Sequence, residues 1–267
     1  MDYAPPKHIP LKGIDTPPDG YNGWLLFLDE INSAPLSMQA AAYKLILDKM
    51  VGIHPLHPKC PIIGAGNKES DGAIVNRMGT AMQSRMVHLE LEVDTLAWLS
   101  WANEAKLDYR AISYVENFPD QLHKFDPNHH DKTFACPRTW EMASKLIKDK
   151  APSPLMLQLL VGTLSAGVAH QFYAHMSYCA ELPSIADIKA RPDDIAIPDE
   201  PAMLYATSHM VAAYLNAANA DRLMRYIDRL PLEFGTTAVQ SALKRNRALM
   251  EIPAVYAWRD KIAAEIF

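Results

Sequence analysis

The chain has 267 residues, of which 49% are hydrophobic and 21% are charged, and its formal net charge is −5 at pH 7. A chain of this length can bury roughly 70 to 75% of the surface that it exposes when unfolded, enough for one large or two small domains. The mild negative charge supplies no global attraction for nucleic acid or for an anionic membrane, so neither is expected as a partner.

Cysteine usage and hydropathy predict a cytoplasmic location. Cys60, Cys136 and Cys179 are odd in number and widely spaced, which is typical of reduced thiols rather than of a disulfide framework. The proline-rich N-terminus lacks the apolar core of a signal peptide. The longest apolar stretch, residues 155–169, is shorter than the ~20 residues that cross a bilayer, and we expect it to form one buried helix.

Residues 24–28 are five apolar residues in a row, and two adjacent carboxylates, Asp29 and Glu30, follow them. Continuous apolarity is typical of a strand covered on both faces, as in a parallel α/β sheet. Because open α/β sheets bind ligands at the carboxyl ends of their strands, the two acids suggest a magnesium-holding and a water-activating carboxylate. For the pair alone, a strand that stops at a solvated turn remains an equal alternative.

A helix and a second strand are expected next. Asn32 and Ser33 are suitable N-caps, Pro35 suits the first helical turn, and apolar residues recur at helical spacing up to Gly52. Residues 60–67 then predict another buried strand that ends in a polar amide. Two parallel strands would bring Asp29, Glu30 and Asn67 to one edge of a sheet.

The proline-rich segment between this helix and strand contains His54 and His57, each followed by a proline. Ligand residue types stand close together here, but the prolines predict a rigid turn. No second cluster completes a tetrahedral site, so zinc binding is the minor alternative.

Three arginines are candidate anion ligands. Residues 86–91 alternate in the manner of a half-exposed strand, with Arg85 directly before them and Arg77 further upstream. Arg138 stands in the first turn of a helix expected over residues 137–149. A cation there opposes the helix dipole, which indicates an anionic partner; a surface salt bridge is the alternative.

From about residue 95 onward nearly every segment is expected to be helical. Asp94 can cap a helix, and residues 108–118 predict another. Residues 183–201, rich in proline and acids, are expected to be a linker. The further helices are expected at 202–219, 221–229, 237–249 and 254–266. We read the basic run of residues 244–247 as a solvated helix face, with weak binding of an acidic partner as the alternative.

These motifs resemble those of a MoxR-like AAA+ ATPase. The Walker B motif of that family matches residues 25–30, its sensor 1 asparagine matches Asn67, and its sensor 2 arginine matches Arg138. Arg85 matches the arginine that such ATPases offer to a neighbouring subunit, and Arg77 is the runner-up for that role. The order and spacing of four elements over residues 23–148 make the resemblance more specific than any one motif.

The resemblance implies an α/β fold followed by an all-α part. Residues 1–93 would be a partial AAA+ core with a parallel sheet, residues 94–182 a helical lid, residues 183–201 a linker, and residues 202–267 a helical bundle. It also implies ATP and Mg²⁺ as cofactors, a homo-oligomeric ring and a chaperone-like remodelling activity. A client protein, or a partner with an adhesion-type domain, is expected, and the segment of residues 54–60 would be a hairpin exposed to the client.

The resemblance also implies a role for each candidate site residue. Asp29 would hold Mg²⁺ and Glu30 would activate the attacking water. Asn67 would position that water against the γ-phosphate. Arg138 would contact the γ-phosphate from the lid, and Arg85 would reach into a neighbouring subunit's site.

The sequence departs from the family at the phosphate-binding loop. No Gly-x-x-x-x-Gly-Lys-Ser/Thr motif occurs in the 267 residues, although such a loop supplies the backbone N–H groups and the lysine that hold the phosphates. We expect the chain to be a fragment or truncated form of an ATP-hydrolysing enzyme that is inactive alone. The alternative is a half-ATPase binding module that hydrolyses nothing and lends Arg85 to an intact partner.

Overall fold

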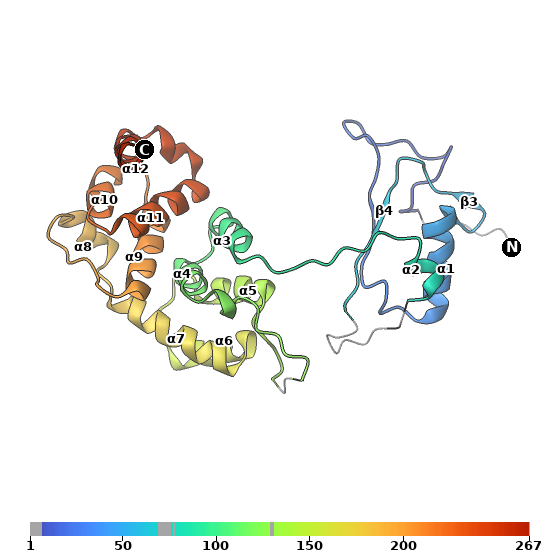
Figure 1. Ribbon diagram of the computed structural model, residues 1–267, viewed down its shortest axis with the longest axis horizontal. Coiled ribbons are helices and arrows are strands. Elements are labelled where there is room, and N and C mark those ends of the chain that lie inside the picture. Colours follow the sequence, from blue (N-terminus) through green and yellow to red (C-terminus); the bar gives the residue numbers. More distant parts are fainter. Residues whose placement is uncertain (1–6, 69–75, 77, 129–130, 267) are drawn as a thin grey trace. The chain divides into compact units, whose positions relative to one another are not determined.

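The computed structural model describes residues 7–68, 76, 78–128 and 131–266 (Figure 1). The chain divides into two compact units. The sheet unit comprises residues 1–91 with residues 126–128, and the helical unit comprises residues 92–125 and 129–267.

The sheet unit contains the predicted pair of parallel strands. Strand β1 (Leu26–Leu28) pairs in parallel with β4 (Ile62–Gly64), and Phe27 stands opposite Ile63 in the register. The pairing continues past the strands, because the Ala65 N–H donates to the Leu28 carbonyl at 2.9 Å. The prediction that the two strand ends share one edge is therefore confirmed.

The expectation that these strands are buried on both faces is wrong. Phe27 and Ile63, the middle residues of the two strands, are 55% and 50% exposed, and Leu25 before β1 is 59% exposed. Successive side chains of a strand point to opposite faces, so these residues share one face. Apolar runs are buried on both sides only where other elements cover both faces, and here the described residues leave one face open.

Helix α1 (Leu36–Asp48) follows β1 and confirms the predicted helix, but not its cap. Pro35 occupies the N-cap position, and no side chain makes a capping bond there. After α1 the chain forms a short antiparallel hairpin from β2 (Met50–Val51) and β3 (His54–Pro55). Gly52, with φ of +63°, supplies the left-handed turn residue that this hairpin needs.

The strand predicted over residues 86–91 is absent. These residues follow the short helix α2 (Thr80–Gln83) and form no ladder with another described segment. Val87, Leu89 and Leu91 are 87%, 84% and 94% exposed. Alternation gives the segment the pattern of a strand, but hydrogen-bonded pairing needs a partner strand that the described part of the sheet unit does not provide.

The first half of the helical unit surrounds an aromatic core. Trp140, Tyr114 and Phe172 are almost fully buried, and their ring centroids lie 5.0 to 5.4 Å apart. Asp94 caps the first helix as predicted, because its side chain accepts the Ala97 N–H at 3.0 Å. The elements around this core are α3 (Thr95–Glu104), α4 (Tyr109–Asn117), η2 (Pro119–Gln121), α5 (Pro137–Ile147), α6 (Pro154–Leu164) and α7 (Ala166–Glu181).

The second half forms another apolar cluster. Its α9 packs against both α4 and α11, so the two halves of the helical unit share a helix-to-helix contact. Residues 183–201, expected as a linker, contain α8, whose Ile188 is fully buried in this cluster. The elements of this half are α8 (Ile185–Ala190), α9 (Pro201–Tyr214), α10 (Ala220–Ile227), α11 (Leu232–Arg245), η3 (Arg247–Glu251) and α12 (Pro253–Ile266).

The apolar stretch at residues 155–169 is not one helix. The chain breaks at Ser165, with φ of +78°, between α6 and α7. The residue at the break is a serine, with Gly162 three positions before it and Gly167 two positions after it. Among the described residues, no helix is long and apolar enough to cross a membrane.

Candidate functional site

The sheet edge gathers three of the predicted site residues. Asp29 and Glu30 follow β1 directly, and Asn67 lies three positions after the end of β4, which runs parallel to β1. All three are exposed to solvent. This edge is therefore open to a ligand from outside the sheet unit.

A tight turn fixes the two acids. Glu30 is left-handed, with φ of +53°, and its N–H donates to Asp29 Oδ1 at 3.0 Å. The following Ile31 N–H donates to the Ala65 carbonyl at 2.9 Å, which ties the turn to the segment after β4. A non-glycine residue in this conformation costs about 1 kcal/mol, and such residues concentrate at functional sites.

The structure adds Asn32, which sequence reasoning assigned to a helix cap. Its Nδ2 donates to the Asn67 carbonyl at 2.7 Å, and its Oδ1 accepts the Asn67 N–H at 3.2 Å. This two-bond contact, the Asn32 clamp, joins the segments that follow β1 and β4. Gly66 makes room for it, because a Cβ there would lie 2.4 Å from Asn32 Oδ1. The glycine next to Asn67 was the sequence signal for this close approach.

Arg85 lies in the sheet unit just after α2. Its guanidinium is exposed, and its Nη1 donates to the Ala81 carbonyl at 2.7 Å. Met82, fully buried, anchors the short helix α2 that precedes Arg85. Among the described residues no hydrogen bond or ion pair joins Arg85 to the acids or to Asn67. Arg77 lies outside the described residues.

Arg138 belongs to the helical unit. It is the second residue of α5, after Pro137, and it is exposed. The predicted apolar stripe of this helix is confirmed, with Trp140, Ala143 and Ile147 fully buried. The position of Arg138 in the first helical turn is confirmed as well.

The carboxylate of Asp29 fits a magnesium ion. Its Oδ1 accepts one backbone N–H, while Oδ2 has no bond to another described residue. Magnesium is usually held by one or two carboxylates together with waters and phosphate oxygens, so a full cage of protein ligands is not required. In the described part of the chain, no three His, Cys, Asp or Glu side chains form a metal-binding group.

A second cluster of reactive side chains lies deep in the helical unit. His175 Nε2 is 2.9 Å from Ser113 Oγ and 3.5 Å from Cys179 Sγ, and all three residues are buried. Burial lowers the pKa of His175 to about 4 and raises the pKa of Cys179 to about 12. A neutral imidazole beside a protonated thiol is a structural arrangement rather than an activated nucleophile.

Comparisons of the chain with protein-family models, curated proteins and solved structures found no match.

Proposed function

We propose that the sheet unit forms the hydrolytic side of an ATP site of the MoxR-like AAA+ type. The observation that carries this proposal is the parallel pairing of β1 and β4, which places Asp29, Glu30 and the clamped Asn67 at one sheet edge. Carboxylates and an amide at the ends of adjacent parallel strands are suited to bind a metal-bound phosphate and a water molecule.

Each residue has a distinct task in this proposal. Asp29 binds Mg²⁺, which when bound neutralises charge on the phosphate oxygens. Glu30 accepts a hydrogen bond from the attacking water and withdraws its proton. Asn67 orients the same water through its side-chain amide, while the Asn32 clamp holds its backbone. These tasks are mainly positional, as expected for phosphoryl transfer.

The arginines would complete the site. In the proposal, Arg138 contacts the γ-phosphate, and Arg85 enters the site of a neighbouring copy, so that a homo-oligomeric ring is the active form. An arginine supplied in trans is worth about 10³ to 10⁵ in rate in related phosphoryl-transfer systems. The proposed biological role is the remodelling of a client protein, and the proposed partner bears an adhesion-type domain.

The test requires a phosphate-binding loop, because the 267 residues contain none. Reading the DNA upstream of the Met1 codon for an in-frame Gly-x-x-x-x-Gly-Lys-Ser/Thr motif identifies the polypeptide to assay. In that polypeptide, Glu30→Gln should lower phosphate release from ATP by at least about 10²-fold and leave ATP binding intact. Glu104→Gln, an exposed change on α3, is the control. Unchanged turnover in Glu30→Gln would show that the assignment is wrong.

A second candidate function is favoured by the exposure of Arg85. The chain would then be a non-hydrolysing module that donates Arg85 to an intact ATPase. Added to a loop-bearing form of itself, the chain should accelerate ATP turnover, and Arg85→Ala should abolish the acceleration. If the Arg85→Ala chain accelerates turnover equally, this second function is excluded.

A further inference from the structure

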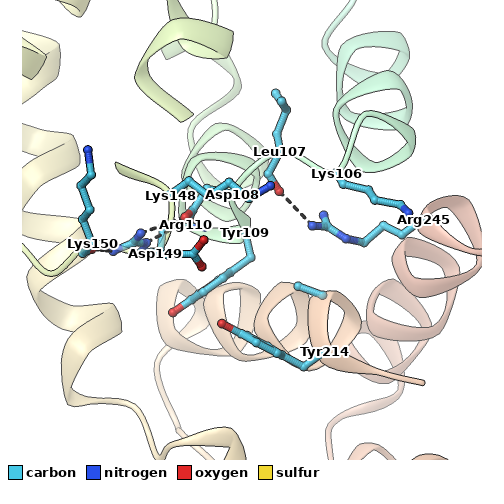
Figure 2. Close-up of a pocket in the computed structure, with 11 residues that line it drawn as sticks. Lys106, Leu107, Asp108, Tyr109, Arg110, Lys148, Asp149, Lys150, Tyr214 and Arg245 are labelled. Carbon is cyan, nitrogen blue, oxygen red and sulfur yellow. Dashed lines mark hydrogen bonds and ion pairs between the residues drawn. The ribbon is translucent and has the colours of Figure 1, made fainter. Parts of the chain in front are cut away.

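A basic pocket in the helical unit is lined by none of the residues of the proposed ATP site (Figure 2). It has a volume of about 330 Å³ and is formed where the start of α4 meets the C-terminal ends of α5, α9 and α11. This volume is at the lower end of the range for small-molecule sites. Its charged and aromatic lining comprises Lys106, Asp108, Tyr109, Arg110, Lys148, Asp149, Lys150, Tyr214 and Arg245.

Two of the charged residues in the lining, Asp108 and Arg110, neutralise each other. Asp108 and Arg110 form a buried pair, in which the Arg110 Nη2 donates to Asp108 Oδ2 at 2.8 Å and Nε donates to Oδ1 at 2.9 Å. Arg110 also donates to the carbonyls of Ile147 and Lys150, both at 2.7 Å, and so caps the end of α5. This pair supports the wall of the pocket and contributes no net charge to it.

The rest of the lining is rich in donors. Lys106, Lys148, Lys150 and Arg245 face a single further carboxylate, Asp149, on a chain whose overall charge is negative. Within the described structure, none of the three lysines pairs with a carboxylate. The C-terminal ends of three helices lie nearby, and because helix C-termini favour positive charge, they explain part of this clustering of cations. In Figure 2 Lys106 extends alongside Arg245, whereas Lys150 extends away from both Arg245 and the tyrosines, so we leave Lys150 out of the proposed ligand set.

Arg245 is the most informative of these cations. It is half-buried, and its Nη2 donates to the Leu107 carbonyl at 2.9 Å, while its Nη1 lies 3.4 Å from Asn103 Oδ1. Neither partner carries a formal charge. Desolvation lowers the pKa of Arg245, consistent with a guanidinium withdrawn from water without a carboxylate in contact. Its remaining N–H groups are available to an anion.

The two tyrosines add further donors. In Figure 2 the hydroxyls of Tyr109 and Tyr214 point in the same direction, toward the side of the pocket opposite Lys106. Neither hydroxyl makes a hydrogen bond to a residue that the structure describes. Burial raises the pKa of Tyr109, so this phenol stays protonated and can donate.

Lys106 adopts a backbone conformation that is strained for a residue other than glycine. Lys106 has φ of +55°, and α3 ends there in a Schellman motif, with Lys106 N–H bonded to the Asn103 carbonyl and Leu107 N–H to the Ala102 carbonyl, both at 2.9 Å. Glycine is the preferred residue at this position of the motif. A lysine there places a charge at the pocket at the expense of backbone strain.

We propose that this pocket binds a small phosphorylated ligand through Lys106, Lys148, Arg245 and the hydroxyls of Tyr109 and Tyr214. Arginine, lysine and unpaired hydroxyl donors that line one pocket suit phosphate oxygens, which accept several hydrogen bonds at once. The basic run at residues 244–247 thus contributes Arg245 to a pocket rather than only to a solvated helix face.

The experiment measures binding of inorganic pyrophosphate to the full chain by calorimetry, with EDTA present so that no magnesium-dependent site contributes. We expect saturable one-to-one binding, which Lys106→Gln/Lys148→Gln weakens about tenfold or more. Lys106→Arg/Lys148→Arg should retain most of it. Lys124→Gln/Lys132→Gln, a matched change of two exposed lysines in the same unit, should leave the affinity unchanged.

Lys106→Gly separates binding from folding. It relieves the left-handed backbone, so the Tm should rise by about 2 °C while pyrophosphate affinity falls. ADP, tested in the same way, distinguishes a nucleotide from free phosphate. Binding tighter than that of pyrophosphate, together with a larger loss of affinity for ADP than for pyrophosphate in Tyr214→Leu, assigns a nucleotide. Equal affinity for the two probes assigns the phosphate groups alone.

Three results would overturn the proposal. One is the absence of pyrophosphate binding at millimolar concentration. Another is an equal loss of affinity in the two Lys→Gln double variants. The third is a loss caused by Asp29→Asn, which would place the bound pyrophosphate at the sheet edge. Because binding here is assayed without magnesium and without turnover, the proposal can fail or hold independently of the ATPase function.

Discussion

Asn32 holds Asn67 by both atoms of its side-chain amide, with Nδ2 donating to the Asn67 carbonyl at 2.7 Å and Oδ1 accepting the Asn67 N–H at 3.2 Å. This contact spans 35 positions of sequence and joins the segments that follow β1 and β4. The two sides of the candidate site are therefore linked by one side chain as well as by the sheet.

Asn32→Ala should release Asn67. The variant loses two hydrogen bonds at an exposed position, so we expect a loss of about 1 kcal/mol in the stability of the sheet unit. Hydrogen exchange of the Asn67 amide, followed by NMR, should become faster while amides of the helical unit are unaffected. An unchanged Asn67 exchange rate would contradict the role of the clamp.

Gly66→Ala should disrupt the same contact by steric means. The added Cβ would lie 2.4 Å from Asn32 Oδ1, which requires the amide to move. We expect a loss of about 1 to 2 kcal/mol, read from chemical denaturation. Gly162→Ala is the matched control, because no atom lies within 4 Å of the added Cβ in α6. That change should stabilise the helix by about 0.5 to 1 kcal/mol.

The buried His175 predicts a pH dependence of stability. Burial lowers its pKa from an ordinary 6.5 to about 4 in the folded chain. The unfolded chain therefore binds a proton more readily, and stability is complete above about pH 6.5 and falls as the pH decreases toward 4. The loss should reach about 3 kcal/mol and level off below pH 4. Denaturation curves between pH 4 and 7 measure it, and His175→Gln should lack this component of the slope.

Asp108→Asn should destabilise the helical unit strongly. The Asp108 and Arg110 side chains are only 6% and 10% exposed, so the change leaves a buried guanidinium without its counter-ion. We expect a loss of about 3 kcal/mol or more. Asp193→Asn is the control, because its pair with Arg225 is 51% and 60% exposed and should contribute less than about 1 kcal/mol. Similar losses in the two variants would contradict this argument.

Ser165→Gly should stabilise the chain. Ser165, with φ of +78° and ψ of 162°, adopts a conformation that is almost restricted to glycine. Glycine removes that strain, and we expect a gain of about 1 kcal/mol in unfolding free energy. Ser165→Ala keeps the Cβ and should show no such gain, so the pair of variants separates backbone strain from loss of the hydroxyl.

The sequence predicted those parts of the fold that depend on local pattern. Helical periodicity and the Asp94 cap were confirmed, and so was the shared edge of the two parallel strands. Each of these features is encoded within one segment or in the order of neighbouring segments. The placement of Arg138 in the first turn of α5 could be predicted for the same reason.

The features that were missed depend on contacts between distant segments. The pattern of residues 86–91 cannot show whether a partner strand exists, and an apolar run such as β1 cannot show what covers it. Asn32 is equally suited to a helix cap and to a clamp on Asn67, and only the fold selects between them. Likewise, the sequence of a basic run does not show that Arg245 lies against Leu107.

The half-exposed face of the two-stranded sheet affects how the protein behaves at high concentration. Strands β1 and β4 pair with each other and with no further strand in the described part of the chain, so each leaves a row of backbone groups along its outer side. Phe27 and Ile63 add apolar surface beside those groups. Such edges are templates for strand addition, and self-association should therefore begin at this sheet as concentration rises.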